Sequence, residues 1–177
     1  IFEYDGTAWT AGNNMSRTPT GSPYLSAYIA GSGTLTAGWA AGGGYPSQNN
    51  LTENYNGTSW TASATMPANR RGGNCTGPQA AGLYFGGNAP GAQAGTYEYD
   101  GEGWTAGGNL NTARTNAAGS GPTGSQTAAL CFTGNSPSQT NKTEEYGGTS
   151  WTEVTVFPRS ASYVSYARSQ TNAIAVS

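Results

Sequence analysis

The chain has 177 residues, only 9% of them charged, and a formal net charge of −2. Seven scattered basic residues do not make the phosphate-binding surface of a nucleic-acid-binding protein, and no apolar run reaches the ~20 residues of a membrane-spanning helix. Histidine is absent, which excludes Ser–His–Asp and Cys–His catalysis and histidine metal centres. We therefore expect no nucleic-acid partner, no membrane insertion and no cofactor.

A box of six residues occurs four times along the chain. Every copy has tyrosine first, glycine third and tryptophan sixth, and its Asp-Gly, Asn-Gly or Gly-Gly dipeptide is typical of a tight turn between antiparallel strands. With a two-residue turn Phe2 would face Trp9, which places Tyr4 and Trp9 on the same side of the hairpin. The four pairs are Tyr4 and Trp9, Tyr55 and Trp60, Tyr99 and Trp104, and Tyr146 and Trp151.

Further strands are expected around these hairpins. Short apolar runs precede three of the boxes, at 37–43, 81–87 and 128–134. An arginine follows each tryptophan after eight to ten residues; these are Arg17, Arg70, Arg114 and Arg159. Weaker strand signals follow the arginines, at 24–30, 72–76, 116–120 and 162–167. The Gly/Pro/Ser/Asn-rich segments 87–95 and 134–141 read as loops.

The repeat spacing predicts the architecture. Tryptophan spacings of 51, 44 and 47 residues suit a propeller blade made of four strands. The chain starts at a hairpin, and residues 171–177 match the apolar runs, with Ile174 aligned to Leu83 and Leu130. The last strand can therefore pair with the first hairpin and leave no exposed edge. We predict one all-β domain over 1–177, a four-bladed β-propeller with four antiparallel strands per blade, closed by pairing of the C-terminal strand with the N-terminal hairpin.

The order Gly-Gly, Tyr, Trp, Arg, as in Gly86-Gly87, Tyr99, Trp104 and Arg114, resembles kelch repeats over essentially the whole chain. Segments 109–114 and 144–151 are also similar to kelch-like arrays in structural proteins of marine bacteriophages. The resemblance implies a β-propeller and a structural role on a virion. Kelch propellers often have more blades, so the number four comes from this sequence. The family includes a copper oxidase, whose metal chemistry needs the histidine that this chain lacks.

The charged residues of the repeat admit two interpretations. Four arginines around a ring could bind an anion on the axis, but a residue present in every repeat usually serves the repeat, so we expect these to bond backbone carbonyls or the repeated glutamates. The acids could suggest the paired carboxylates of a glycosidase, yet they occupy hairpin positions that the repeat sets. They are Glu3, Glu98, Asp100, Glu144 and Glu145. We expect neither a catalytic nor a metal site, and therefore no enzyme.

Two other residue classes bear on function. Cys75 and Cys131 are too few for a disulfide framework, and we expect buried thiols. Polar and aromatic residues in loops can stack on sugar rings and hydrogen-bond them, and the candidates for such loop contacts are Tyr45, Tyr97 and Asn49.

Three functions remain open. The first hypothesis is a non-enzymatic structural or adhesion propeller, extracellular or on a virion, which associates with itself or with protein partners in a larger assembly. The alternative is a lectin-like propeller that binds glycans or a receptor, with several weak sites acting together. The third, a lyase or glycosidase built on carboxylates and tyrosine, has the least support because the charge is sparse and histidine is absent.

Overall fold

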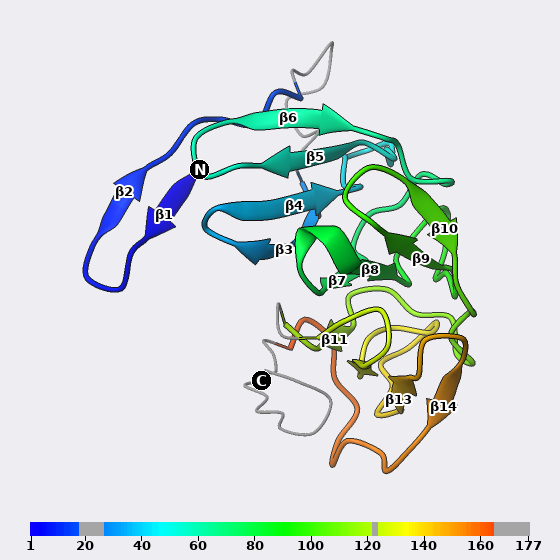
Figure 1. Ribbon diagram of the computed structural model, residues 1–177. Helices are drawn as coiled ribbons and strands as arrows, with labels where there is room; N and C mark the ends of the chain where they lie inside the picture. Colours follow the sequence, from blue (N-terminus) through cyan, green and yellow to red (C-terminus); the bar gives the residue numbers. More distant parts are fainter. Residues whose placement is uncertain (18–26, 122–123, 165–177) are drawn as a thin grey trace.

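The computed structural model describes residues 1–17, 27–121 and 124–164 (Figure 1). Its strands form three four-stranded sheets and one two-stranded hairpin, and all strand pairs are antiparallel. A single 3₁₀ turn, η1 (Gln79–Ala81), is the one helical element of the described residues. The prediction of an all-β fold is confirmed.

The elements follow the repeat in chain order. The first hairpin comprises β1 (Phe2–Tyr4) and β2 (Trp9–Ala11). The first sheet comprises β3 (Ala30–Thr34), β4 (Ala37–Ala41), β5 (Thr52–Tyr55) and β6 (Trp60–Ser63). The second comprises β7 (Asn74–Thr76), β8 (Gly82–Phe85), β9 (Thr96–Tyr99) and β10 (Trp104–Ala106). The third comprises β11 (Ala118–Gly119), β12 (Ala129–Phe132), β13 (Thr143–Tyr146) and β14 (Trp151–Glu153).

The expected hairpins and apolar strands are present. Each strand that the structure describes after an arginine, however, pairs with the apolar strand of the next repeat and not with the hairpin before it. β7 follows Arg70 and pairs with β8 of the next repeat, and β11 likewise pairs with β12. Each sheet therefore combines the end of one repeat with the beginning of the next. β3 begins only at Ala30, later than expected. Of the expected strand 162–167, residues 162–164 form no strand and 165–167 lie outside the described residues.

The hairpin register also differs from the expected one. Tyr4 pairs directly with Trp9, so the loop has four residues instead of two. The reason is the Asp5 carboxylate, which accepts hydrogen bonds from the amides of Thr7 and Ala8 at 2.8 and 2.9 Å and so supports a wider loop, with Gly6 at a φ of 103°. Because the register is shifted by two residues, Tyr4 and Trp9 still share a face, and their ring centres lie 5.2 Å apart.

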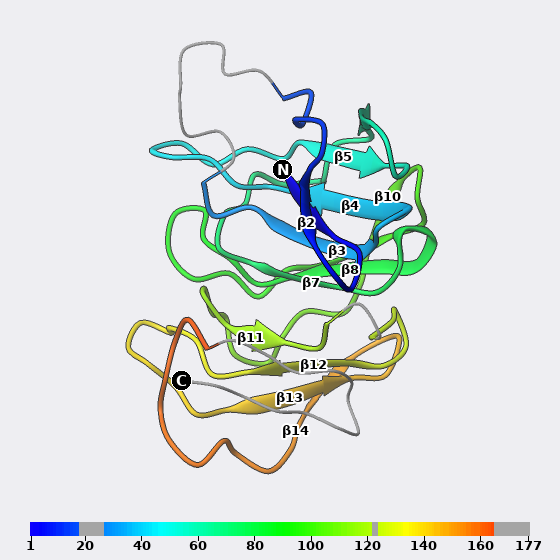
Figure 2. The same ribbon diagram turned by 90° about the vertical axis from the view of Figure 1, so that its left-hand side faces the viewer.

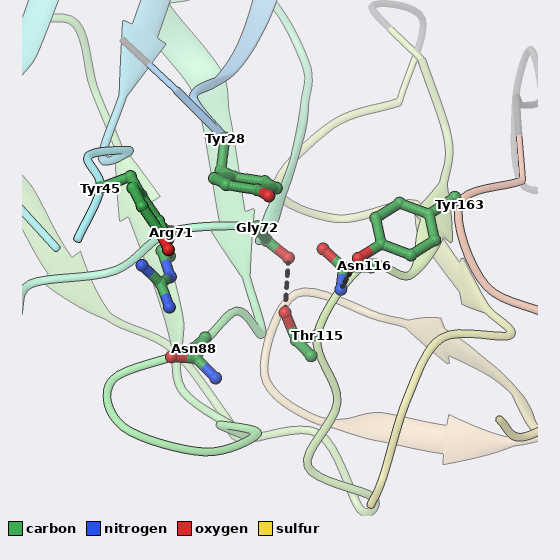
Figure 3. A pocket seen from close by; sticks show the side chains of 8 residues that line it. All are labelled: Tyr28, Tyr45, Arg71, Gly72, Asn88, Thr115, Asn116 and Tyr163. Carbon is green, nitrogen blue, oxygen red and sulfur yellow. Dashed lines mark hydrogen bonds between the residues drawn. The ribbon is translucent and has the colours of Figure 1, made fainter. Parts of the chain in front are cut away.

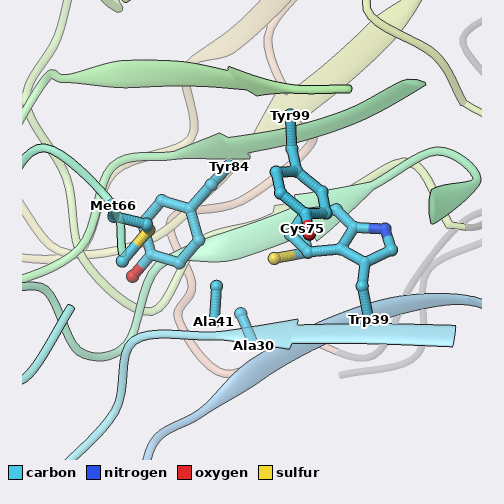
Figure 4. Close-up of a cluster of buried hydrophobic side chains, with 7 residues drawn as sticks. All are labelled: Ala30, Trp39, Ala41, Met66, Cys75, Tyr84 and Tyr99. Carbon is cyan, nitrogen blue, oxygen red and sulfur yellow. The ribbon is translucent and has the colours of Figure 1, made fainter. Parts of the chain in front are cut away.

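The three sheets follow one another in an arc, and the β1–β2 hairpin stands at one end of the arc beside the first sheet (Figures 1 and 2). The hydrophobic core lies between the sheets. Trp39 on β4 packs against Tyr99 of the second sheet, with ring centres 5.5 Å apart (Figure 4). It also packs against Trp104 of that sheet, at 5.7 Å. Phe85 on β8 packs in the same way against Trp151 of the third sheet, at 5.0 Å.

This packing depends on Gly82 at the start of β8, which has no side chain. A Cβ on Gly82 would lie 2.4 Å from the Trp39 ring, so the glycine lets the indole lie directly on β8. The aromatic pairs thus supply the burial that scarce aliphatic residues do not. The expected closing strand, residues 171–177, lies outside the described residues.

Candidate functional site

A corner of the same conformation recurs in every repeat. Tyr28, Gly72, Asn116 and Tyr163 have φ values of 57°, 59°, 54° and 57°, in the left-handed region that only glycine adopts without strain. Three of these four positions nevertheless carry side chains. Backbone strain of this kind persists where the surrounding structure fixes it, and it is a pointer to a functional site.

Backbone hydrogen bonds join these corners in series. The amide of Gly72 donates to the carbonyl of Tyr28 at 3.0 Å, that of Asn116 to Gly72 at 2.8 Å, and that of Tyr163 to Asn116 at 3.1 Å. β7, which follows the Gly72 corner, also packs against β3 and against β11, which follow the corners on either side. The corners from four repeats therefore converge on one place.

A pocket of about 140 Å³ opens where they converge (Figure 3). Its volume is well below the ~300 Å³ at which typical small-molecule sites begin, so it suits one small chemical group. Eight residues line it; they are Tyr28, Tyr45, Arg71, Gly72, Asn88, Thr115, Asn116 and Tyr163. Three tyrosines and one cation thus surround a small space, and Tyr28, Tyr45 and Tyr163 are 52%, 49% and 69% exposed.

Arg71 is the one charged residue of the lining. Its guanidinium carbon lies 5.9 Å from the Tyr28 ring centre and 5.4 Å from the Tyr45 ring centre, within the range of cation–π attraction. Its Nη1 donates to the carbonyl of Pro46 at 2.9 Å. The two rings and the carbonyl hold the guanidinium in place beside the pocket.

Amide and hydroxyl groups complete the lining. Asn88 accepts a hydrogen bond from the Gln48 side chain at 3.1 Å, which leaves its Nδ2 as a donor. Asn116 donates from its own Nδ2 to the Tyr163 hydroxyl at 3.1 Å. The proton of that hydroxyl can then be donated to a ligand. Polar groups beside tyrosine rings are what a sugar needs, because a sugar presents both an apolar ring face and hydroxyls.

The residues predicted to contact a ligand lie in different places. Tyr45 lines the pocket. Tyr97 on β9 does not, and its hydroxyl accepts a hydrogen bond from Arg70 at 3.2 Å. Asn49 bridges to Arg70 through the backbone and accepts the amide of Leu51 on its side chain. Sequence reasoning missed Tyr28, Arg71, Asn88, Asn116 and Tyr163.

The repeated arginines lie away from the pocket. The side chain of Arg114 is fully buried, pairs with the buried carboxylate of Glu144, and donates to the carbonyls of Thr133 and Lys142. Arg17, with a side chain that is 1% exposed, pairs with Glu53 at 2.7 Å and donates to carbonyls of the first sheet. These contacts join consecutive segments of the repeat.

The Arg17 and Arg114 guanidiniums occupy equivalent places although one arginine follows its tryptophan by eight residues and the other by ten. In the second sheet Tyr97 stands where Glu53 and Glu144 stand in the others, so Arg70 bonds a hydroxyl and its Nε is buried without a partner. Arg159 is exposed in the described structure.

The acids serve the scaffold. Burial raises the pKa of Glu53, but hydrogen bonds from Arg17 and Ser16 outweigh it and hold that pKa below its ordinary value. The Ala8 amide and the Thr7 hydroxyl and amide lower the pKa of Asp5 to about 2. Glu98 accepts the Tyr146 hydroxyl at 2.7 Å. Each of these carboxylates thus accepts hydrogen bonds from the scaffold.

The two cysteines are buried free thiols, and burial raises the pKa of Cys131 to about 12 and that of Cys75 well above its ordinary value. Among the described residues, no three His, Cys, Asp or Glu side chains gather closely enough to hold a metal ion. The described part of the chain likewise holds no helix of the length and apolarity that crossing a membrane requires.

Comparison with known proteins gives no relative from which a function could be transferred. No family model matches the chain, and no curated protein is significantly similar to it. The repeat and the pocket are therefore the basis for assigning a function.

Proposed function

We propose that the chain closes into a four-bladed, kelch-like β-propeller and acts as a non-enzymatic adhesion module that binds a glycan at its axial pocket. The observation that carries the proposal is the pocket itself, where one corner from each of four repeats meets beside three tyrosines and an arginine. A site on the axis of a propeller is complete only when all the blades are in place.

The first hairpin stands in the place of half a blade. Between the first and second sheets, the Tyr99 hydroxyl donates to the Asn54 side chain at 2.9 Å, and between the second and third, Tyr146 donates to Glu98. The same contact joins Tyr55 to Glu3 of the β1–β2 hairpin. The hairpin therefore meets the first sheet as each outer strand pair meets the following sheet.

An indole contact extends this equivalence. Trp104 donates its Nε1 to the Thr52 hydroxyl at 3.1 Å, and Trp151 donates to Thr96 at 2.9 Å. The residue of the first hairpin at that repeat position is Ile1, which has no hydroxyl. Trp60 accordingly has a buried indole nitrogen without a partner.

Apolar surface flanks the place of the fourth blade on both sides. A cavity of about 330 Å³ lies between the hairpin and the first sheet, lined by Phe2, Trp39 and Trp60 among others. A second cavity, of about 230 Å³, lies on the face of the third sheet that carries Leu130 and Phe132. We propose that the remaining C-terminal residues, with Ile174 in the place of Leu83 and Leu130, complete the blade between these surfaces.

A binding role fits this arrangement better than catalysis. The carboxylates Glu53, Glu98 and Glu144 are each held by a scaffold partner and do not line the pocket. The pocket lining offers rings and neutral donors with one cation, a combination that can recognise a sugar but does not include the carboxylate pair of a glycosidase.

The wider setting is part of the proposal. We place the module outside the cell or on a virion, within a larger assembly with protein partners or copies of itself. Its exposed apolar residues Phe2 and Trp9, 73% and 69% exposed, are assigned to closure. Several copies in one assembly would raise the avidity of a weak axial site.

The test is a screen of the full chain against neutral and acidic methyl glycosides by NMR. We expect at least one sugar to shift the amide signals of Gly72 and Asn116. Tyr45→Ala should lower the affinity for that sugar by about three- to ten-fold, because one aromatic contact is lost. Val156→Ala, which removes a comparably exposed side chain (53%) outside the pocket, should leave binding unchanged. If no sugar shifts those amides at millimolar concentration, the proposed function is wrong.

A further inference from the structure

Arg71 departs from the repeat in a way that the scaffold does not explain. The corner residues align the repeats, and the residue just before each corner is Ala27, Arg71, Thr115 or Ser162. The position therefore tolerates an alanine, and the cation there is not needed to build the corner. Arg114, by contrast, has a fully buried carboxylate partner.

Tyr45 departs from the repeat in the same way. It follows the paired glycines of the first sheet, and the corresponding residues of the next two are Ala89 and Ser136. The two unusual residues contact each other, with the guanidinium 5.4 Å from the ring centre. Two departures from the repeat that meet at one pocket indicate a specific ligand.

The guanidinium is available to that ligand. Of its five N–H donors, the structure engages one, on Nη1, with the carbonyl of Pro46. Among the described residues, none hydrogen-bonds the edge formed by Nε and Nη2, and no carboxylate lines the pocket to neutralise the charge. An unengaged guanidinium edge matches the two oxygens of a carboxylate in geometry and charge.

We propose that the axial pocket recognises an acidic sugar, a terminal uronate or a sugar acid of similar size, whose carboxylate pairs with the Nε–Nη2 edge of Arg71. This rests on the proposed function and names its ligand class. One arginine balances one negative charge, which favours a carboxylate over a phosphate dianion. The volume of about 140 Å³ admits a terminal group and not a run of sugars. The exposed rings of Tyr28 and Tyr163 offer faces for the sugar ring.

The experiment compares three probes on the full chain by NMR titration: methyl β-glucuronide, methyl β-glucoside and acetate. We expect the glucuronide to bind at least about ten-fold more tightly than the glucoside, because a charged, bidentate pair is gained. Acetate should bind more weakly than the glucuronide, since it lacks the ring.

Three variants locate the effect. Arg71→Gln should weaken binding of the glucuronide by about ten-fold or more and affect binding of the glucoside far less, because only the glucuronide carries the carboxylate. Arg71→Lys should recover only part of the loss, because lysine keeps the charge but not the fork. Lys142→Gln, an equal change of charge at an exposed site outside the pocket, is the matched control and should change nothing. Unchanged unfolding midpoints of the Arg71 variants would show that the fold is kept.

The outcomes separate the two claims. Equal binding of glucuronide and glucoside, with no effect of Arg71→Gln, would overturn the acidic ligand while the glycan-binding function stands. Acetate binding as tightly as glucuronide would overturn the sugar part of this inference. Failure of every sugar in the wider screen would overturn the proposed function itself.

Discussion

Among the described residues, two ion pairs have side chains that are almost completely buried, Arg17 with Glu53 and Arg114 with Glu144, and further hydrogen bonds support both. Glu144 accepts from Arg114 and from the backbone amides of Asn111 and Thr112, at 2.7 and 3.2 Å for the amides. A buried ion pair is weak evidence for net stability, but breaking one leaves an uncompensated charge away from water. The pair therefore holds residues 111–114 against β13, and its loss should lower the free energy of unfolding substantially.

This contrast can be measured with two single substitutions. Glu144→Gln should lower the free energy of unfolding by about 3–5 kcal/mol, because the Arg114 charge stays buried without its partner. Lys142→Gln breaks the exposed pair with Glu153, whose side chain is 47% exposed, and should cost less than about 1 kcal/mol. Urea denaturation of both variants gives the comparison, and equal losses would contradict the structural role of the buried pair.

The hairpin shows at the scale of an element what a sequence can and cannot reveal. The repeated turn dipeptides suffice to place all four hairpins and to put each Tyr and Trp on one face. The register could not be predicted, because it depends on a side chain. Asp5, Asn56 and Asp100 each accept two backbone amides of their own loop, which widens it from two residues to four.

The fourth loop lacks this support, since Gly147 occupies the position of the capping residue. Gly147→Asp should raise the free energy of unfolding by about 0.5–1.5 kcal/mol, from the new hydrogen bonds and the less flexible unfolded chain. A Cβ there meets nothing within 4 Å, and its φ is not in the left-handed region. Thermal unfolding is the measurement.

The neighbouring glycine is the control for that substitution. Gly148 has a φ of 94°, which an aspartate does not adopt without strain, so Gly148→Asp should be destabilising. If both substitutions lowered the melting temperature alike, the account of the loop would be wrong.

At the scale of the whole molecule, four repeats converge on one pocket. The sequence predicts the number of repeats and one pocket residue, Tyr45. It does not predict the others, because the corners carry no common residue type: their shared property is a backbone conformation, held by Tyr28, Gly72, Asn116 and Tyr163. Arg70 belongs to the repeated arginines, and Arg71 beside it does not. That difference is the one sequence signal that distinguishes Arg71 as a candidate site residue.

The sequence also does not predict which strands share a sheet. A propensity pattern places β7 after Arg70, but its pairing with β8 depends on the three-dimensional path of the chain after β7. The proposed closure depends in the same way on a pairing between the ends of the chain, which no local pattern determines. In the proposed ring, Trp9 is the residue whose surroundings would change most. It is 69% exposed in the described structure, and a closed ring would pack it against Leu130 and Phe132.

The most direct test of closure is therefore the free energy of unfolding of Trp9→Ala, measured beside Trp104→Ala, its counterpart at an interface that the structure describes. A closed four-bladed ring predicts similar losses for the two variants, about 3–5 kcal/mol each. A loss below about 0.5 kcal/mol for Trp9→Ala alone, as for an ordinary surface residue, would contradict the ring and with it the axial site.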